Sequence, residues 1–281
     1  MIFVYFVSIL AGISSGVTES INKSITEKKY SSFSYFFLQL SLNGLLFLIP
    51  FLLFGSFPKL SIVYLYIFLA VLATFLGNLS LIKAYKTEDI SNITILLQSS
   101  LLVTFTSGIV FLHEKINMIN IVGFLAIICG ILIIFYEGKK LRLSFGLFLA
   151  LVVGLSFGIS AVFQKLALSL VDPLSFVFIF DFFIVSILLF IPKTYKDIKT
   201  IFGKYKKKII LSRFTAVSAF YLLLWTYQRS KIAVANVNFT TVFLLSSVLI
   251  GILFLGERKN ISKKLAGSLL CVLGIILLNF F

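Results

Sequence analysis

The chain has 281 residues, of which 60% are hydrophobic and only 12% are charged, and its mean hydropathy is +1.11. A soluble domain is about half apolar and about a quarter charged, so this composition excludes an ordinary soluble protein. The net charge of +15 is spread over loops between long apolar stretches. It is therefore typical of topology signals and contacts with anionic lipid, not of nucleic-acid binding.

Ten apolar stretches are predicted to be membrane-spanning helices, since each is near the ~20 residues that a spanning helix needs. They cover residues 2–21, 32–54, 62–83, 90–112, 117–136, 143–164, 174–192, 209–228, 233–255 and 264–281. The first stretch has no basic segment before it, so we expect it to remain as a span and not to be cleaved as a signal peptide. The strict alternation of a transmembrane β-barrel is not seen. The expected fold class is an all-α polytopic membrane protein.

Residues 11–136 and 153–276 repeat one pattern about 142 positions apart. Gly12, Ser14, Gly16, Lys23, Tyr85 and Ile90 recur as Gly154, Ser156, Gly158, Lys165, Tyr227 and Ile232. After two one-residue slips, Glu114, Gly123 and Gly130 recur as Glu257, Gly267 and Gly274. A collinear series of this kind indicates an internal duplication. We therefore predict two five-helix repeats, residues 1–138 and 139–281, and an odd number of spans per repeat inverts the second relative to the first.

The recurring glycines lie four or seven apart on apolar helices, where small residues let another helix approach closely. Simple packing is the commoner reason for such a pattern. Because the pattern recurs in both copies, it favours specific contacts that are equivalent in the two halves.

Lysine and arginine are distributed unevenly between the two sets of loops. The loops after spans 1, 3, 5, 7 and 9 carry 19 of them, and the loops after spans 2, 4, 6 and 8 carry 5; Arg213, at the start of span 8, is the remaining one. Cytoplasmic loops carry the excess of positive charge. This count therefore places both termini outside.

The second half of each repeat carries a resemblance to a known family. Residues 81–86 read Leu-Ile-Lys-Ala-Tyr-Lys, and the following span ends at Phe111-Leu112-His113-Glu114, before Gly123 and Gly130. Trp225-Thr226-Tyr227-Gln228, Leu255-Gly256-Glu257, Gly267 and Gly274 repeat this order. Over essentially its whole length, the chain resembles EamA-type members of the drug/metabolite transporter superfamily, as two EamA-like units. The resemblance implies transport, often export, of small metabolites across the cytoplasmic membrane.

The chain departs from that family in two respects. Family members often have a proline midway along spans 4 and 9, whereas residues 96–100 and 239–242 contain none. The sequence thus gives no reason to place a helix break there. Ten-span relatives also usually keep both termini in the cytoplasm, opposite to the charge count.

Two acidic residues fall within the predicted spans, where an ionisable group is costly and usually faces a cavity or a partner. Asp181 lies in span 7 and is equivalent to Gln39, so this helix face is polar in both copies. Glu19 lies near the end of span 1. Burial disfavours a charged carboxyl group, which could therefore gain and lose a proton as a site opens to either side. Both are candidates for substrate binding or proton coupling; the alternatives are a hydrogen bond to another span for Asp181 and a pair with Lys23 for Glu19.

Further polar and aromatic residues are candidates for lining a substrate cavity. Asn78, Gln98, Gln164, Asn236 and Asn238 lie deep in spans, and Tyr221 and Trp225 share one face of span 8. Aromatic rings beside amide groups suit a mostly apolar pocket with a few orienting hydrogen bonds. For each residue alone, core packing or an interhelical hydrogen bond is the simpler interpretation.

Charged residues at the span ends have structural interpretations too. Lys23 and Lys165 end spans 1 and 6, where snorkelling to head groups is the simpler interpretation and a charge at each cavity mouth the functional one. Glu114 and Glu257 follow spans 4 and 9, where each is expected to pair with its neighbouring cation or to cap a helix.

Motifs of soluble enzymes, phosphate loops and metal sites are missing from the sequence, and Cys129 and Cys271 lie inside apolar stretches as expected of packing residues. We expect no cofactor and no metal. The favoured function is a secondary transporter of a small metabolite, amino acid or drug, working by alternating access with protons or by exchange. The alternatives are a translocase for lipid or lipid-linked substrates and an intramembrane enzyme. The expected partners are a small-molecule substrate and the lipid bilayer of a prokaryotic cell membrane, with the chain as a monomer or homodimer.

Overall fold

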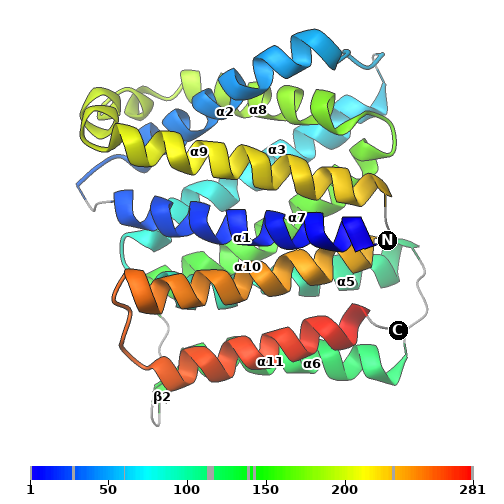
Figure 1. The fold of residues 1–281 in the computed structure, drawn as a ribbon, viewed down its shortest axis with the longest axis vertical. Coiled ribbons are helices and arrows are strands. Elements are labelled where there is room, and N and C mark those ends of the chain that lie inside the picture. Colours follow the sequence, from blue (N-terminus) through cyan, green and yellow to red (C-terminus); the bar gives the residue numbers. More distant parts are fainter. Residues whose placement is uncertain are drawn as a thin grey trace.

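The computed structural model describes residues 2–26, 29–59, 61–112, 117–137, 140–141, 144–229 and 232–279. The first half contains α1 (Ile2–Ile25), α2 (Ser32–Phe54), α3 (Ile62–Tyr85), α4 (Ile90–Leu97), α5 (Ser99–Leu112) and α6 (Met118–Phe135). The second contains α7 (Phe145–Leu168), α8 (Pro173–Leu189), the 3-10 helix η1 (Pro192–Thr194), α9 (Ile198–Arg229), α10 (Ile232–Phe254) and α11 (Ile261–Asn279). Between the halves, β1 (Tyr136–Glu137) pairs antiparallel with β2 (Lys140–Leu141) (Figure 1).

Apart from this short pair, the described elements are helical, which confirms the predicted all-α class. Each predicted span falls on a helix, with span 4 divided between α4 and α5. Within the described residues, seven helical segments are long and apolar enough to cross a membrane, and Pro173–Leu189 of α8 and Phe239–Phe254 of α10 form shorter apolar helices. Large apolar side chains such as Leu52, Phe54 and Phe190 are exposed, as expected of a surface that faces lipid.

Local sequence signals define several helix starts. Asn117 and Asn120 form a reciprocal capping box at the start of α6. The side chain of Ser144 accepts a hydrogen bond from a backbone N–H in the first turn of α7, and Asp172 does the same for α8, whose first residue is Pro173. These side chains satisfy amide groups that have no partner within the helix.

Helices of the two halves pair in a reciprocal pattern. Helix α3 packs against α7 as α1 packs against α9, and α5 packs against α7 as α10 packs against α1. The equivalent helices α2 and α8, and α6 and α11, pair with each other. Exchanging the halves leaves this pattern unchanged, as a two-fold relation between them requires.

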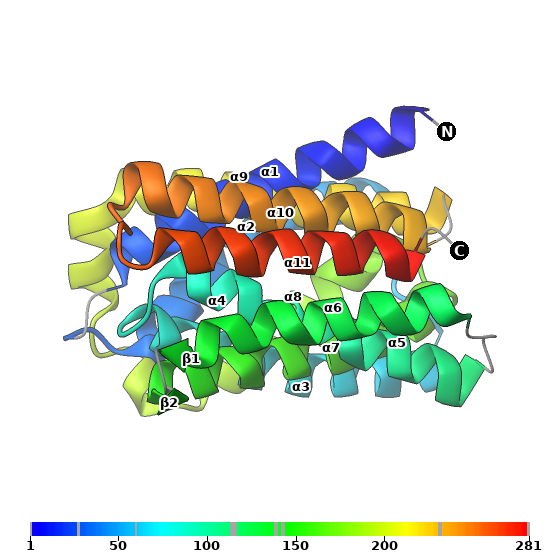
Figure 2. The same cartoon turned by 90° about the horizontal axis from the view of Figure 1, so that it is seen from below.

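The ends of the bundle can be told apart by the chain termini. Both termini lie at one end, and the β1–β2 pair lies at the other (Figures 1 and 2). We call these the terminal end and the hairpin end. The turns after α1, α3 and α10 lie at the hairpin end. The first half of the chain therefore begins at the terminal end and finishes at the hairpin end.

Glycines of α1 and α7 make equivalent contacts with the opposite half. A Cβ atom placed on each glycine would lie against Val242 for Gly12, Ser246 for Gly16, Ser99 for Gly154 and Val103 for Gly158. After the one-residue slip, Ser99 and Val103 are the positions equivalent to Val242 and Ser246. The small residues therefore form the same close helix contact twice.

Glycines also join α6 to α11. A Cβ on Gly123 would lie 2.8 Å from the carbonyl oxygen of Gly274, and a Cβ on Gly130 would lie 2.7 Å from that of Gly267. Gly123 is equivalent to Gly267, and Gly130 is equivalent to Gly274. Gly123 therefore contacts the counterpart of Gly130, and Gly130 contacts the counterpart of Gly123. The order of these contacts shows that the two equivalent helices run antiparallel.

The helix of span 4 tightens at Gln98 even though it contains no proline: Gln98 keeps helical backbone angles, but its N–H bonds the carbonyl of Ile95, three residues back. Helix α4 ends at Leu97 and α5 begins at Ser99, with Gln98 between them. The Gln98 amide donates to the carbonyl of Thr94 at 3.0 Å, and the Thr94 hydroxyl donates to the carbonyl of Ile90 at 2.6 Å. Side chains that bond to nearby carbonyls satisfy backbone groups at such a tightened turn within a membrane span.

Candidate functional site

A buried polar cluster lies among α1, α2, α3, α8 and α9, and Asn22 is its centre. The side-chain oxygen Oδ1 of Asn22 accepts three hydrogen bonds. They come from the hydroxyl of Tyr35 at 2.8 Å, the hydroxyl of Ser212 at 2.6 Å and Nη2 of Arg213 at 2.8 Å. All four side chains are buried. One amide therefore connects the first half of the chain to a buried cation from the second half.

Glu19 extends the cluster along α1. Its Oε2 accepts a hydrogen bond from the Asn22 amide at 3.2 Å and another from the hydroxyl of Tyr85. Charge-assisted hydrogen bonds of this kind are among the stronger ones in proteins. The Glu19 carboxyl group also interacts electrostatically with Arg213. The residue is thus held by α1 and α3 and faces the cation on α9.

Asp181 of α8 is the second acidic group near this cation. Its side chain is 4% exposed, and it interacts electrostatically with Arg213. It makes no hydrogen bond or ion pair with the described residues, and Nε of Arg213 is likewise buried without a hydrogen-bond partner among them. Buried polar groups in this condition are costly and invite a ligand, a proton or water.

The equivalent positions in the other half have no charges. Val71 is equivalent to Arg213, Ala161 to Glu19 and Val177 to Tyr35, and Gln39 takes the place of Asp181. Val71 and Val177 are fully buried. The same helix pairing therefore packs well with apolar side chains, and the charged set is not required by the fold.

The predicted site residues fall into separate groups. Gln39 is buried beside Tyr35 and so joins the cluster with Glu19 and Asp181. Asn78 and Gln164 lie elsewhere, at the contact of α3 with α7. The Asn78 amide donates to the carbonyl of Thr74 at 3.1 Å, and the Gln164 amide donates to the hydroxyl of Ser160 at 3.0 Å.

The remaining predicted residues are not brought to the cluster. Gln98 is engaged at the tightened turn between α4 and α5. Tyr221 and Trp225 lie on α9, about two and three turns beyond Arg213. The side chains of Asn236 and Asn238 lie outside the part of the chain that the structure describes. Of the predicted residues, the structure thus brings Glu19, Gln39 and Asp181 together.

Sequence reasoning did not find Asn22, Tyr35, Tyr85 or Arg213 as site residues. From the sequence alone, Arg213 is only a charge at the start of a span. A signal was present, however, because Arg213 and Glu19 stand where the other repeat has valine and alanine. Within the described residues, no group of three or more metal-binding side chains occurs.

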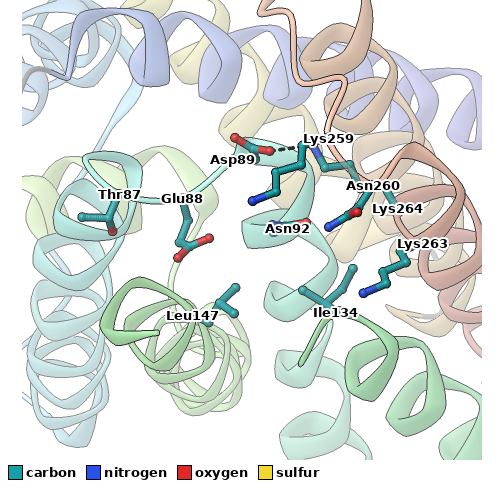
Figure 3. Close-up of a pocket in the computed structure, with 10 residues that line it drawn as sticks. All are labelled: Thr87, Glu88, Asp89, Asn92, Ile134, Leu147, Lys259, Asn260, Lys263 and Lys264. Carbon is teal, nitrogen blue, oxygen red and sulfur yellow. Dashed lines mark hydrogen bonds and ion pairs between the residues drawn. The ribbon is translucent and has the colours of Figure 1, made fainter. Parts of the chain in front are cut away.

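A second polar region lies at the hairpin end. The Glu257 carboxylate accepts hydrogen bonds from the backbone N–H groups of Ile90 at 2.5 Å and Ser91 at 3.1 Å, and so caps α4 from the opposite half. Beside it, the α3–α4 turn and the α10–α11 turn enclose a cavity of about 110 Å³. Figure 3 shows Glu88 and Asp89 on one wall and the side chains of Lys263 and Lys264 on the other.

The bundle, with lipid-facing apolar surfaces and a charged cluster inside, defines a polytopic membrane protein built from two related halves. A family model described as the EamA-like transporter family matches residues 2–136 and again residues 144–280, and the chain belongs to this family. The resemblance expected from the sequence is thereby confirmed, and the members of this family are transporters.

A comparison with solved structures agrees on the fold. One, described only as "Crystal structure of protein", matches with a TM-score of 0.65 and 12% sequence identity, over 97% of this chain and 96% of that chain. At this identity the likeness shows the fold alone. No curated protein matches the chain.

Proposed function

We propose that this protein is a secondary transporter that moves a small polar solute across the cytoplasmic membrane by alternating access. The carrying observation is the charged set of Asp181 and Arg213, which are buried, and Glu19, which is partly buried; the equivalent half of the same fold replaces all three with uncharged residues. Ionisable groups inside a membrane protein mark pathways for substrates and ions. We assign the substrate site to this cluster, and export is the direction that the family resemblance favours.

In this proposal the ten helical segments cross the membrane, and the two halves have opposite orientations. The antiparallel contact of Gly123 with Gly274 and the position of both termini at one end support this arrangement. Inverted halves can rock about a site between them so that it opens to one side at a time. For the orientation in the membrane, the count of lysine and arginine favours both termini outside, whereas the resemblance to ten-span relatives favours both termini in the cytoplasm.

The cluster also suggests how transport would be driven. One cation, Arg213, faces two carboxyl groups, and Arg213 is the electrostatic partner of Asp181 among the described residues. Binding a proton or a cationic group would stabilise such a carboxyl group, and releasing it would reverse the effect. We therefore propose that the carrier is coupled to protons or exchanges one charged solute for another, with Asp181 and Glu19 as the groups that titrate.

Two other functions are weaker. A lipid translocase would use the exposed apolar faces, but a charged cluster enclosed by five helices suits a polar solute better. An intramembrane enzyme would need two converging catalytic groups, whereas Glu19 and Asp181 each have Arg213 as an electrostatic partner and not one another.

The first experiment is a thermal-stability screen of the detergent-purified protein against amino acids, nucleosides, sugars and cationic drugs. A ligand at one hundred times its Kd stabilises the folded state by about 2.7 kcal/mol. A solute that binds is then tested in proteoliposomes with the triple variant Glu19→Ala, Asp181→Gln, Arg213→Val, which copies the residues of the other half. We expect this variant to fold, because no unpaired charge remains, and to lose both binding and transport.

The matched control is Lys83→Met, which removes an exposed charge that makes no hydrogen bond with the described residues, so this variant should bind as the unchanged protein does. Binding and transport in the triple variant equal to those of this control would disprove the assigned site. A screen in which lipid analogues alone stabilise the protein would favour the translocase.

A further inference from the structure

The turn between α3 and α4 is held at the hairpin end by both halves of the chain. Lys264 of α11 forms an ion pair with Asp89 at 2.7 Å and lies 3.4 Å from the carboxylate of Glu257. The hydroxyl of Ser144, just before α7, donates a hydrogen bond to the carboxylate of Glu88. The second half thus binds this turn from two directions.

Lys23, at the end of α1, completes the contact from the first half. Its ammonium donates hydrogen bonds to the backbone carbonyls of Tyr85 and Glu88, and it interacts electrostatically with the nearby carboxylates of Asp89 and Glu257. A lysine that ends a membrane span normally extends toward head groups. This one instead turns to the protein and ties the end of α1 to the end of α3.

The equivalent lysine of the other half, Lys165, is exposed. Lys165 ends α7 as Lys23 ends α1, but its side chain is exposed and makes no hydrogen bond or ion pair with the described residues. Its equivalent acceptor would be the carbonyl of Tyr227 at the end of α9. The rest of the helix pairing is reciprocal, so among the described residues the two halves differ in this lysine contact.

Tyr85 connects the Lys23 contact to the polar cluster. Its hydroxyl donates to Glu19, and its carbonyl accepts from Lys23. Glu19 and Lys23 are four residues apart, so they lie one turn from each other on the same face of α1. Binding of a proton or solute at Glu19 would therefore act on Tyr85, whose carbonyl accepts from Lys23, and on the turn of α1 that carries Lys23.

We propose that Lys23 is a gating residue that closes the hairpin end of the cluster, and that Lys165 makes the equivalent contact at the terminal end when the hairpin end opens. The inference rests on the transport function proposed above and deepens it. Hydrogen bonds from a charged donor are strong enough to bias an equilibrium between two states and weak enough to break in every cycle.

The test follows a cysteine at the buried Ser212, placed in a chain whose native Cys129 and Cys271 are changed to alanine. A membrane-impermeant maleimide is added to inside-out or right-side-out vesicles, so that it reaches one end at a time. A second single-cysteine protein, with the substitution at the exposed Lys196, identifies the vesicles that present the hairpin end. We expect Lys23→Met to raise labelling of Ser212→Cys from the hairpin end by at least about tenfold, because the loss of even one of its two charged hydrogen bonds corresponds to a factor of that size.

Three further variants separate gating from a structural role. Lys83→Met should leave labelling unchanged, Lys23→Arg should restore the slow rate, and Lys165→Met should not raise labelling from the hairpin end. Equal rates in Lys23→Met and Lys83→Met would overturn the proposal. Faster labelling from both ends, together with a lower melting temperature, would show a loosened fold and would overturn it equally.

The labelling needs no substrate, so its outcome is separate from that of the transport assay. Failure of the gate would leave the substrate site at Glu19, Asp181 and Arg213 untouched. A failure to find a transported solute would leave the measured change in access valid as a property of the bundle.

Discussion

Nη2 of Arg213 lies 2.8 Å from Oδ1 of Asn22, so an amide on α1 binds a buried guanidinium on α9. Asn22 Oδ1 also accepts from the hydroxyl groups of Tyr35 and Ser212, and the Ser212 hydroxyl in turn accepts from Nη2 of Arg213 at 2.6 Å. Its positive charge is balanced electrostatically by Glu19 and Asp181. Stability and function of the cluster should therefore depend on the charges as a set.

A double-mutant cycle tests this dependence. Arg213→Met alone leaves the buried Asp181 and the partly buried Glu19 without their cation and should destabilise the protein by about 3–5 kcal/mol. In the double variant with Asp181→Asn, we expect a total cost below the sum of the single costs, with a coupling of about 0.5–3 kcal/mol. The measurement is the free energy of unfolding in detergent at one fixed pH. Additive costs would show that Arg213 and Asp181 do not interact.

The architecture could be predicted from the sequence because it rests on signals that repeat. The duplicated spacing of Gly12 and Gly16 with Gly154 and Gly158 predicted equivalent helix contacts, and the structure places both pairs against equivalent positions of the opposite half. Apolar length alone located the ten helical segments. The tightened turn at Gln98 could not be predicted, since it arises from side-chain hydrogen bonds and not from proline.

The cluster was only half predicted, for a physical reason. Glu19 and Asp181 stand out because charges are rare in spans, but which polar residues join them depends on how five helices meet. Tyr85 recurs in both copies and so carried no sign of its hydrogen bond to Glu19. Asn78 and Gln164 looked equally suitable, yet they form local bonds at the other helix contact.

The contact between α6 and α11 gives a prediction about the glycines. Gly123→Ala should destabilise the protein by about 1–3 kcal/mol, as overpacking does. The reason is that the added methyl group would lie 2.8 Å from the Gly274 carbonyl and also close to backbone atoms of α11, which cannot move independently. Gly44→Ala in α2 is the matched control, because a Cβ there meets nothing within 4 Å. Melting temperatures of the two variants that change equally would refute the close contact.

The cap that Glu257 provides to α4 gives a second stability prediction. Glu257→Gln keeps the shape but removes the charge that accepts from Ile90 and Ser91 and pairs with Lys264. Hydrogen bonds to charged groups contribute about 1.5–3 kcal/mol, so a loss of that order is expected in the free energy of unfolding. Arg258→Gln, at the exposed neighbouring position, should change it by less than about 0.5 kcal/mol. A loss in Glu257→Gln no larger than this would mean that the cap is not formed.

The tyrosines of the cluster give a prediction that compares the hydrogen bond to Glu19 with the hydrogen bond to Asn22. Tyr85→Phe removes a donor to Glu19 and leaves the backbone carbonyl that accepts from Lys23, whereas Tyr35→Phe removes a donor to Asn22. Hydrogen bonds to a charged group contribute about 1.5–3 kcal/mol and neutral ones about 0.5–1.5 kcal/mol, so Tyr85→Phe should cost more stability. Chemical unfolding of both variants measures the difference. The opposite order would indicate that Glu19 is uncharged in the folded protein, and would place the negative charge of the cluster on Asp181 alone.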